Sequence, residues 1–218
     1  MPSPFDQSTY QVRFEWSADG LARLAPADVV VVVDVLRFSS TAADLVKTGH
    51  AVDLAEARRW SVNGAEVALR AQSPVVLLGS IRNAAATARA VRTIQERRAA
   101  RTSVAVIAAG ERTADGGLRF AVEDQLGAGA VIASLVDLGI DHTSPEAATA
   151  AESFRSLRRA IRHLLTASGS GRELAEDVAS TEKMTAAGIR PVTVVEAAEL
   201  DAVDAVPVLR DGRFIAFD

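Results

Sequence analysis

Five consecutive valines and a following Asp-Val pair, residues 29–35, constrain the fold of this chain more than any other feature of its sequence. A continuous β-branched run without polar alternation is typical of a strand covered on both faces, as in a parallel sheet flanked by helices. Polar residues follow at once, beginning with Asp34, Arg37 and Ser39. The segment therefore predicts a central strand whose carboxyl end leads into a polar loop.

The same order of strand, polar loop and helix recurs along the chain. Residues 74–78 and 102–111 predict two further buried strands, and helical patterning follows the three strands at 41–48, 83–100 and 121–139. This alternation predicts an α/β fold with a mostly parallel sheet flanked by helices. Because ligands bind beyond the carboxyl ends of such strands, we expect the polar strand-to-helix loops to form the site.

The rest of the chain predicts smaller elements. Ser168-Gly169-Ser170-Gly171 is expected to be a flexible or anion-facing loop, and 206–217 a closing hairpin with Asp211-Gly212 at its turn. We expect one α/β domain over residues 1–218, divisible into sub-lobes 1–142 and 143–218, with a C-terminal helical and hairpin portion. The remaining expected strands are 10–16, 51–53 and 192–196, and the remaining helices are 20–25, 53–60, 64–72, 144–165 and 171–188.

Composition excludes several classes of function. The net charge of -4 gives no broad basic surface for nucleic acid. The chain has no Cys, which excludes thiolate metal sites and cysteine-nucleophile phosphatases, and its three His residues follow no metal-ligand spacing. The longest apolar run is too short to span a bilayer, and the N-terminus does not resemble a signal peptide. We therefore expect a cytoplasmic protein without a membrane partner.

The loop after the valine run combines residue types suited to binding a phosphate. Asp34 at the end of a buried strand is costly unless it is paired or bound to metal, and Arg37 offers a planar fork for an anion. Ser39, Ser40 and Thr41 bring hydroxyls to the start of a helix, where anions are favoured. The alternative is an Asp34–Arg37 salt bridge beside an ordinary helix cap.

A second cluster, Ser80, Arg82 and Asn83, follows the next buried strand. Two clusters that each hold an Arg and a Ser predict a substrate acid with two anionic groups. Asn83 as a plain N-cap and Arg82 as a surface charge remain the alternative. Asn63-Gly64 is a further candidate for substrate binding, although Asn-Gly is most often only a turn.

Three carboxylates complete the candidate site. Glu111 follows a buried strand, and Glu123 and Asp124 open the next helix, where they also favour the positive end of the helix dipole. Mg²⁺ prefers oxygen ligands and keeps several waters, so one or two carboxylates suffice. The aspartyl-phosphate chemistry requires an Asp at the position that Leu36 occupies, which leaves a metal-assisted route.

The motifs VVVDVLRFSST, SVNGA, LLGSIRNAAATA and VAVIAAGE, followed by LRFAVEDQLGAGAVI, resemble in order and spacing those of the 2-phosphosulfolactate phosphatase family. The resemblance runs from about residue 29 to residue 212. It implies Mg²⁺-dependent hydrolysis of 2-phospho-3-sulfolactate to 3-sulfolactate and phosphate, a step of coenzyme M biosynthesis. It also implies that the site includes Asp34, Arg37, Ser39, Thr41, Asn63, Gly64, Ser80, Asn83, Glu111, Glu123 and Asp124.

The chain departs from the family pattern in two places. A stretch that usually separates the first helix from the Asn-Gly segment is missing between Gly49 and Asn63, and residues 177–190 look like an insertion. We predict a phosphatase for a small acidic phosphoester, and a homodimer. A non-catalytic relative that binds a small anion, having lost part of the site, remains the alternative. The expected roles are catalytic for Asp34, Arg37 and Glu111, metal-binding for Asp34, Glu123 and Asp124, and substrate-binding for Ser39, Ser40, Thr41, Asn63, Gly64, Ser80, Arg82 and Asn83.

Overall fold

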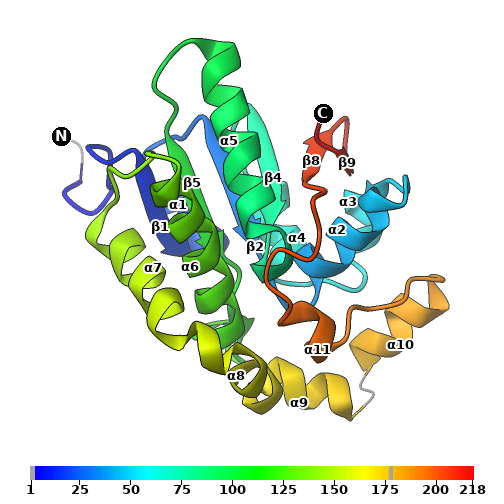
Figure 1. Cartoon of the computed structure of the whole chain (residues 1–218). Coiled ribbons are helices and arrows are strands. Elements are labelled where there is room, and N and C mark those ends of the chain that lie inside the picture. The colour runs from blue at the N-terminus through cyan, green and yellow to red at the C-terminus, as the bar shows by residue number, and fades with distance from the viewer. Residues whose placement is uncertain (1–2, 177–178) are drawn as a thin grey trace.

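A seven-stranded sheet runs through the centre of the computed structural model, which describes residues 3–176 and 179–218 (Figure 1). The strand order is β1-β5-β2-β4-β8-β9-β3, in which the first four strands are parallel and the last three antiparallel. The predicted α/β class with a mostly parallel sheet is thus confirmed. The strands are β1 Val12–Trp16, β2 Val29–Val33, β3 Val52–Asp53, β4 Val75–Gly79, β5 Val104–Ala108, β8 Pro207–Arg210 and β9 Arg213–Ala216.

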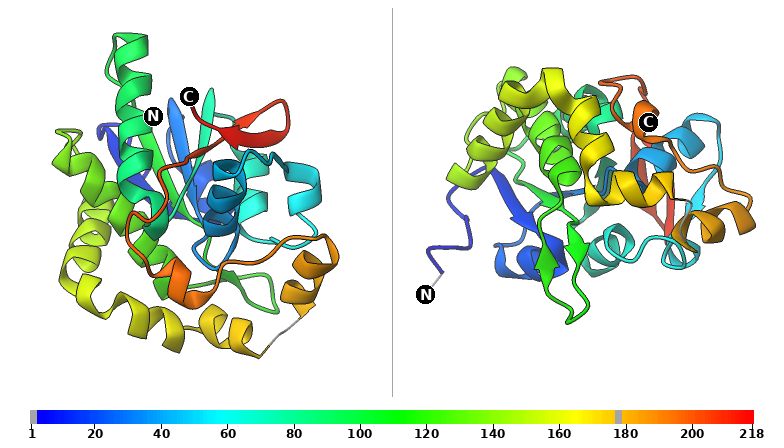
Figure 2. Two further views of the ribbon diagram at one scale, coloured as in Figure 1. Left: turned by 45° about the vertical axis from the view of Figure 1, so that its right-hand side comes forward. Right: turned by 90° about the horizontal axis from the view of Figure 1, so that it is seen from below.

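Helices cover both faces of the sheet (Figures 1 and 2). The helices α5, α6 and α7 pack on one face, and α1, α2 and α4 pack on the other. These two helical layers cover both faces of the parallel strands. A polar ligand can therefore bind only at the ends of the strands. The bounds are α1 Ser17–Arg23, α2 Phe38–Lys47, α4 Gly64–Arg70, α5 Ala84–Arg98, α6 Val122–Asp137 and α7 Pro145–Leu157.

The valine run of β2 explains why the strand lies in the middle of the sheet. Val29, Val31 and Val33 belong to the apolar core on the side of α5 and α6, whereas Val30 and Val32 belong to the core on the side of α2 and α4. All five are at most 2% exposed. A strand with no polar face can be stable only between two helical layers, as its sequence predicts.

Shorter elements complete the chain, and several lie at the edge where the parallel strands end (Figure 1). The small antiparallel hairpin of β6 and β7, which the sequence did not predict, follows β5 and projects from this edge (Figure 2). The bounds are α3 Leu54–Ala57, η1 Ile81–Asn83, β6 Glu111–Arg112, β7 Leu118–Arg119, η2 Arg158–Ala160, α8 Ile161–Ala167, α9 Gly169–Ala175, α10 Ala179–Ala186 and α11 Val194–Ala197. No helix within the described part of the chain is long and apolar enough to cross a membrane.

Two expected elements of the C-terminal third are wrong. The segment 168–171 is not a loop, because the Ser168 hydroxyl accepts a hydrogen bond from the Gly171 amide at 3.0 Å and caps α9. The segment 192–196 is not a strand, because Thr193 and Glu196 form a capping box that starts α11. The expected helix 171–188 is observed as the separate helices α9 and α10, and its residues 177–178 lie outside the described residues.

The predicted closing hairpin is confirmed. Asp211 and Gly212 form its turn with positive φ angles of 48° and 77°, which Gly adopts freely and Asp tolerates. The hairpin joins the sheet between β4 and β3, so the C-terminal residues pair with strands from the first half of the chain.

The carboxyl ends of the parallel strands lie level with one another. Val33 at the end of β2 is paired with Gly79 of β4 and with Ala108 of β5. The Ala109 amide also donates to the Val33 carbonyl at 2.8 Å. The polar loops that follow these three strands therefore begin side by side at one edge of the sheet.

Candidate active site

A cavity of about 170 Å³ opens at this edge of the sheet, where the loops after β2 and β5 meet the start of α4, the first turn of α6 and α9. It brings together most of the charged residues that the sequence predicts for the site, together with Asn63. The charged residues that line the cavity are Asp34, Arg37, Glu111, Glu123 and Asp124.

Asp34 lies at the bottom of the cavity and is held mainly by backbone amides. Its Oδ1 accepts a hydrogen bond from the Phe38 amide at 3.3 Å, and its Oδ2 accepts one from the Gly64 amide at 3.1 Å and one from the Ser61 hydroxyl at 3.3 Å. Burial raises the pKa of Asp34 to about 6, and the negative charge of Glu111 acts in the same direction.

Gly64 is required for this arrangement. A Cβ atom at Gly64 would lie only 2.5 Å from Oδ2 of Asp34, so any larger residue would push the carboxylate away from the amide that binds it. The Asn-Gly pair is therefore more than a turn, since its glycine lets the backbone approach Asp34.

Asp124, at the start of α6, joins the loops that follow two neighbouring strands. Its Oδ1 accepts a hydrogen bond from the Val35 amide at 2.8 Å, and its Oδ2 accepts one from the Gly110 amide at 2.9 Å. Burial raises the pKa of Asp124 well above its ordinary value, and the nearby charges of Asp34 and Glu123 add to this effect. Two carboxylates thus lie close together in a site that penalises their negative charge.

Two of the three glutamates that line the cavity, Glu111 and Glu123, differ in their surroundings. Glu123 is only 3% exposed, and its carboxylate accepts no hydrogen bond from the described part of the chain. Oε1 of Glu111 accepts a hydrogen bond from the Asn63 side-chain amide at 3.1 Å and one from the Arg112 backbone amide at 2.9 Å. Asn63 therefore fixes Glu111, whereas Glu123 remains available to a ligand.

Arg37 brings a positive charge to the cavity. Its side chain is largely buried at 7% exposure, and it donates a hydrogen bond to the Thr181 hydroxyl of α10. Burial lowers the pKa of the guanidinium, and the charges of Glu173 and Asp34 oppose that shift. A guanidinium keeps its proton in proteins, so Arg37 is positioned to bind an anion in the cavity.

The three hydroxyls after Arg37 lie outside the cavity lining and bond to the backbone instead. The Ser39 hydroxyl donates to the Val32 carbonyl at 3.1 Å and accepts from the Asp34 amide at 3.0 Å. The Ser40 hydroxyl donates to the Val35 carbonyl at 2.8 Å, and the Thr41 hydroxyl accepts from the Val192 amide at 3.2 Å. They fix the shape of the loop that carries Asp34 and Arg37.

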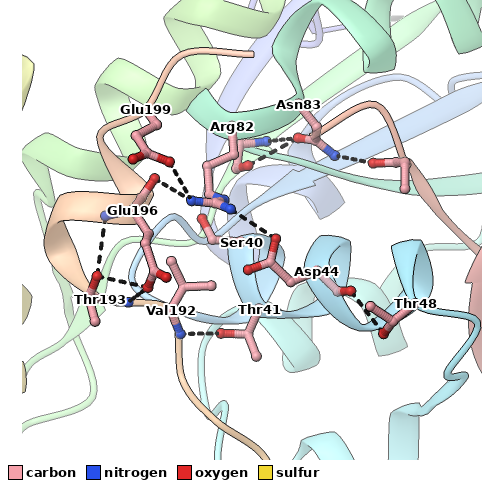
Figure 3. A network of polar contacts seen from close by, with 12 residues as sticks. Ser40, Thr41, Asp44, Thr48, Arg82, Asn83, Val192, Thr193, Glu196 and Glu199 are labelled. Atoms are coloured by element: carbon pink, nitrogen blue, oxygen red, sulfur yellow. Dashed lines mark hydrogen bonds and ion pairs between the residues drawn. The ribbon is translucent and has the colours of Figure 1, made fainter. Parts of the chain in front are cut away.

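The second predicted cluster also lies outside the cavity lining, and Figure 3 shows the polar contacts that its residues make instead. Asn83 accepts hydrogen bonds from the amide and the hydroxyl of Ser80 at 2.8 and 3.0 Å, which closes a capping box at η1. Arg82 donates to Asp44 at 3.0 Å and to the Glu196 carbonyl at 2.5 Å, and it forms a 3.5 Å ion pair with Glu199.

Ser80, Arg82 and Asn83 lie outside the cavity because the segment from α11 to β8 covers the end of β4. The Val203 amide, for example, donates to the Arg82 carbonyl at 2.8 Å. Arg82 is thereby held among carboxylates and a carbonyl, and it ties this segment to α2 (Figure 3).

The cavity also contains two polar residues that the sequence analysis did not name as site candidates, Ser61, which donates to Asp34, and Glu173 of α9. Ser170 of the segment 168–171, expected as a flexible or anion-facing loop, lines the cavity from α9. Ser61 precedes Asn63 by two residues, so the Asn-Gly segment was a usable signal for it. The sequence pattern of α9 did not indicate that the Glu173 side chain lines this cavity.

The donor set of the cavity suits a hard divalent cation. No three His, Cys, Asp or Glu side chains in ranges 3–176 and 179–218 lie close enough together to hold a metal ion unaided. Mg²⁺ does not need such a group, because it is usually held by one or two carboxylates, several waters and phosphate oxygens of a substrate. Within the described part of the chain, Asp34, Glu123 and Asp124 form no ion pair with Lys or Arg, and these three buried carboxylates share the cavity with one cationic residue, Arg37. This excess of buried negative charge suits Mg²⁺.

Residues 59–212 match the family model described as 2-phosphosulpholactate phosphatase. The matched range contains Asn63, Glu111, Glu123 and Asp124 of the cavity and begins after Asp34. No curated protein matches the chain. Since the match covers well over half of the 218 residues, the chain belongs to the 2-phosphosulpholactate phosphatase family.

Proposed function

We propose that the chain hydrolyses the phosphate ester of a small acid, 2-phospho-3-sulfolactate, in the presence of Mg²⁺. The observation that carries this proposal is the buried cavity in which Asp34, Glu123 and Asp124 lie beside the cationic Arg37. Such a site pairs acceptors for a divalent cation with a donor for phosphate, which is the combination that phosphoryl transfer requires. Family membership supports the same reaction class.

One or two of the carboxylates Asp34, Glu123 and Asp124 would hold Mg²⁺, with waters and phosphate oxygens as the remaining ligands. When bound, the ion would neutralise the charge of the phosphate oxygens and lower the pKa of a nearby water. Glu123 is the one of the three whose carboxylate makes no hydrogen bond to the described residues, so it is the most available ligand. The hydrogen bonds from the Val35 and Gly110 amides keep Asp124 fixed in place, which reduces the reorganisation needed on binding.

Arg37 and Glu111 supply the remaining chemistry. Arg37 donates hydrogen bonds to phosphate oxygens and stabilises the charge that develops on them. Glu111, oriented by Asn63, accepts a proton from the water that attacks phosphorus. The bond from phosphorus to the ester oxygen breaks, and that oxygen takes a proton from solvent water to give the free hydroxy acid and inorganic phosphate. Glu111 then releases the proton that it accepted to solvent.

The experiment is a phosphate-release assay with 2-phospho-3-sulfolactate and Mg²⁺. Asp34→Asn should lower kcat/KM by at least about 100-fold, because it removes a buried acceptor of the cation. The matched control is Asp137→Asn, the same chemical change at the exposed end of α6, where Asp137 pairs with Arg155 at 3.1 Å. That control should keep wild-type kinetics.

Wild-type turnover by folded Asp34→Asn would contradict the role of Asp34. Saturable binding of the ester by the wild-type chain without phosphate release would favour the small-anion binder instead. Circular dichroism of both variants shows whether a lost activity comes from the site or from unfolding.

A further inference from the structure

A second cavity, of about 420 Å³, adjoins the candidate active site. The two cavities share five lining residues, so a ligand in one can extend into the other. The second cavity is also lined by residues from β7, from the segment after it and from the start of α9. The shared residues are Glu111, Ala121, Glu123, Ser170 and Glu173.

The β6–β7 hairpin forms one wall of this second cavity. Glu111 is paired with Arg119 across the hairpin, and Arg112 is paired with Leu118. Paired residues in an antiparallel ladder share a face, and successive residues alternate faces. Accordingly, Arg119 lines the second cavity, whereas Arg112 and Leu118 line another hollow, and Glu111 lines both.

Arg119 is the cationic residue among the lining residues of the second cavity. Its guanidinium forms no ion pair or hydrogen bond with the described part of the chain. The Ser170 hydroxyl, which lines both cavities, likewise has no hydrogen-bond partner there. An unpaired guanidinium and a hydroxyl are donors for a compact oxyanion such as a carboxylate or a sulfonate.

The residues around Arg119 restrict which molecules can place an oxyanion beside it. Phe120 and Val122 give this cavity an apolar wall, and Phe120 is held by ring contact with Trp16 at 5.2 Å. The acids Glu111, Glu123 and Glu173 line both cavities, and Glu111 is the cross-strand neighbour of Arg119. Among these acids, Arg119 and Ser170 are the donors that an anion in the second cavity can bind.

We propose that Arg119, assisted by Ser170, binds a second oxyanion of the substrate and so selects phosphoesters that carry a carboxylate or sulfonate over those that do not. This inference rests on the proposed phosphatase function and adds a specificity-determining residue to it. The sequence predicted that Arg82 binds the second anion. The proposal gives this role to Arg119, which lines the adjoining cavity, because Arg82 is paired with Asp44.

The kinetic test compares Arg119→Gln with the matched control Arg112→Gln on the opposite face of the same hairpin. For 2-phospho-3-sulfolactate, Arg119→Gln should raise KM about 10- to 100-fold, the effect of one charge-assisted hydrogen bond, with little change in kcat. For glycerol 2-phosphate, which lacks a second oxyanion, KM should not change. Arg112→Gln should leave both substrates unaffected, and Arg119→Lys should recover part of the loss.

A binding measurement separates failure of this inference from failure of the phosphatase function. Isothermal titration of the full chain with 3-sulfolactate and, in the absence of Mg²⁺, with phosphoglycolate reports on the anion site without turnover. Weaker binding of these ligands by Arg119→Gln supports the site, even if no phosphate is released from any ester. Equal effects of the two Gln variants, or unchanged affinity and KM in Arg119→Gln, would overturn it.

The two ligands also distinguish the source of the oxyanion. A loss confined to 3-sulfolactate identifies a sulfonate at Arg119, because phosphoglycolate carries none, and a loss with both ligands identifies a carboxylate, which both carry. A titration in which neither ligand binds the wild-type chain would overturn the proposal in both forms.

Discussion

Replacing Gly64 by Ala tests how closely the backbone must approach Asp34. The added Cβ would lie 2.5 Å from Oδ2 of Asp34 and 2.8 Å from Cδ1 of Phe38. Phe38 is 1% exposed and cannot move aside, so the carboxylate has to shift. The cost is about 1.5–3 kcal/mol for the hydrogen bond to a charged acceptor and about 1–3 kcal/mol for overpacking. Ala has a higher helix propensity than Gly, which offsets at most about 1 kcal/mol of this loss of stability.

We therefore expect Gly64→Ala to lower the free energy of unfolding by about 2–5 kcal/mol. A shift of Asp34 by about 1 Å should also lower kcat/KM about 100-fold. Urea denaturation and phosphate release with Mg²⁺ measure the two effects. The matched control is Gly20→Ala in α1, whose Cβ would meet the flexible end of the Glu15 side chain at 2.7 Å and should change stability by less than about 1 kcal/mol. If Gly64→Ala matched that control in both assays, the close approach would have no role in positioning Asp34.

Three further predictions concern single side chains. Asp124→Asn should lose about 1–3 kcal/mol of stability in urea denaturation, because an amide can satisfy only one of the two backbone donors, and unchanged stability would contradict the bridging role of the carboxylate. Arg82→Met should lower stability by about 3 kcal/mol in thermal denaturation, since it leaves Asp44 and a buried carbonyl without their donor, whereas a raised KM at unchanged stability would support a substrate role for Arg82. The pKa of Asp34 in the folded state, about 6, lies above its ordinary value, so the folded state favours the protonated carboxyl. The contribution of this carboxyl to the free energy of unfolding is therefore present at low pH and is lost as pH rises through about 6. Wild type without metal should therefore lose stability relative to Asp34→Asn between about pH 4 and pH 7, and a pH-independent difference would show that the carboxyl is not perturbed.

The sequence predicted the parts of the fold that local patterns determine. The valine run, the polar loop after it and the Asp-Gly turn of the last hairpin each carry their own signal. The position of Asp34 at a strand end was likewise predictable, because the carboxyl ends of parallel strands meet. The helix at 194–197 was also within reach, since Thr193 and Glu196 have the spacing of a capping box, but the β-branched residues around them favoured a strand.

Other features depended on contacts between distant segments. Arg37 and Arg82 follow equivalent strand ends with similar local sequences, yet only Arg37 lines the cavity. The difference arises because a segment more than 100 residues downstream covers Arg82, as its bond to the Glu196 carbonyl shows. The position of Asp124 also depends on a distant segment, because the Val35 amide that donates to its carboxylate lies 89 residues away in sequence. No periodicity or motif in the neighbourhood of either residue contains this information.

The placement of the last hairpin between β4 and β3 affects how the chain matures during synthesis. Residues 52–53 leave the ribosome long before residues 213–216, the strand with which they pair. Until β8 docks, the nascent polypeptide presents the bare side of β4, whose unpaired amides and carbonyls can recruit another chain. Long-range pairing of this kind is slow, so the unfinished polypeptide is the form of this protein most exposed to aggregation, and addition of the final hairpin ends that exposure.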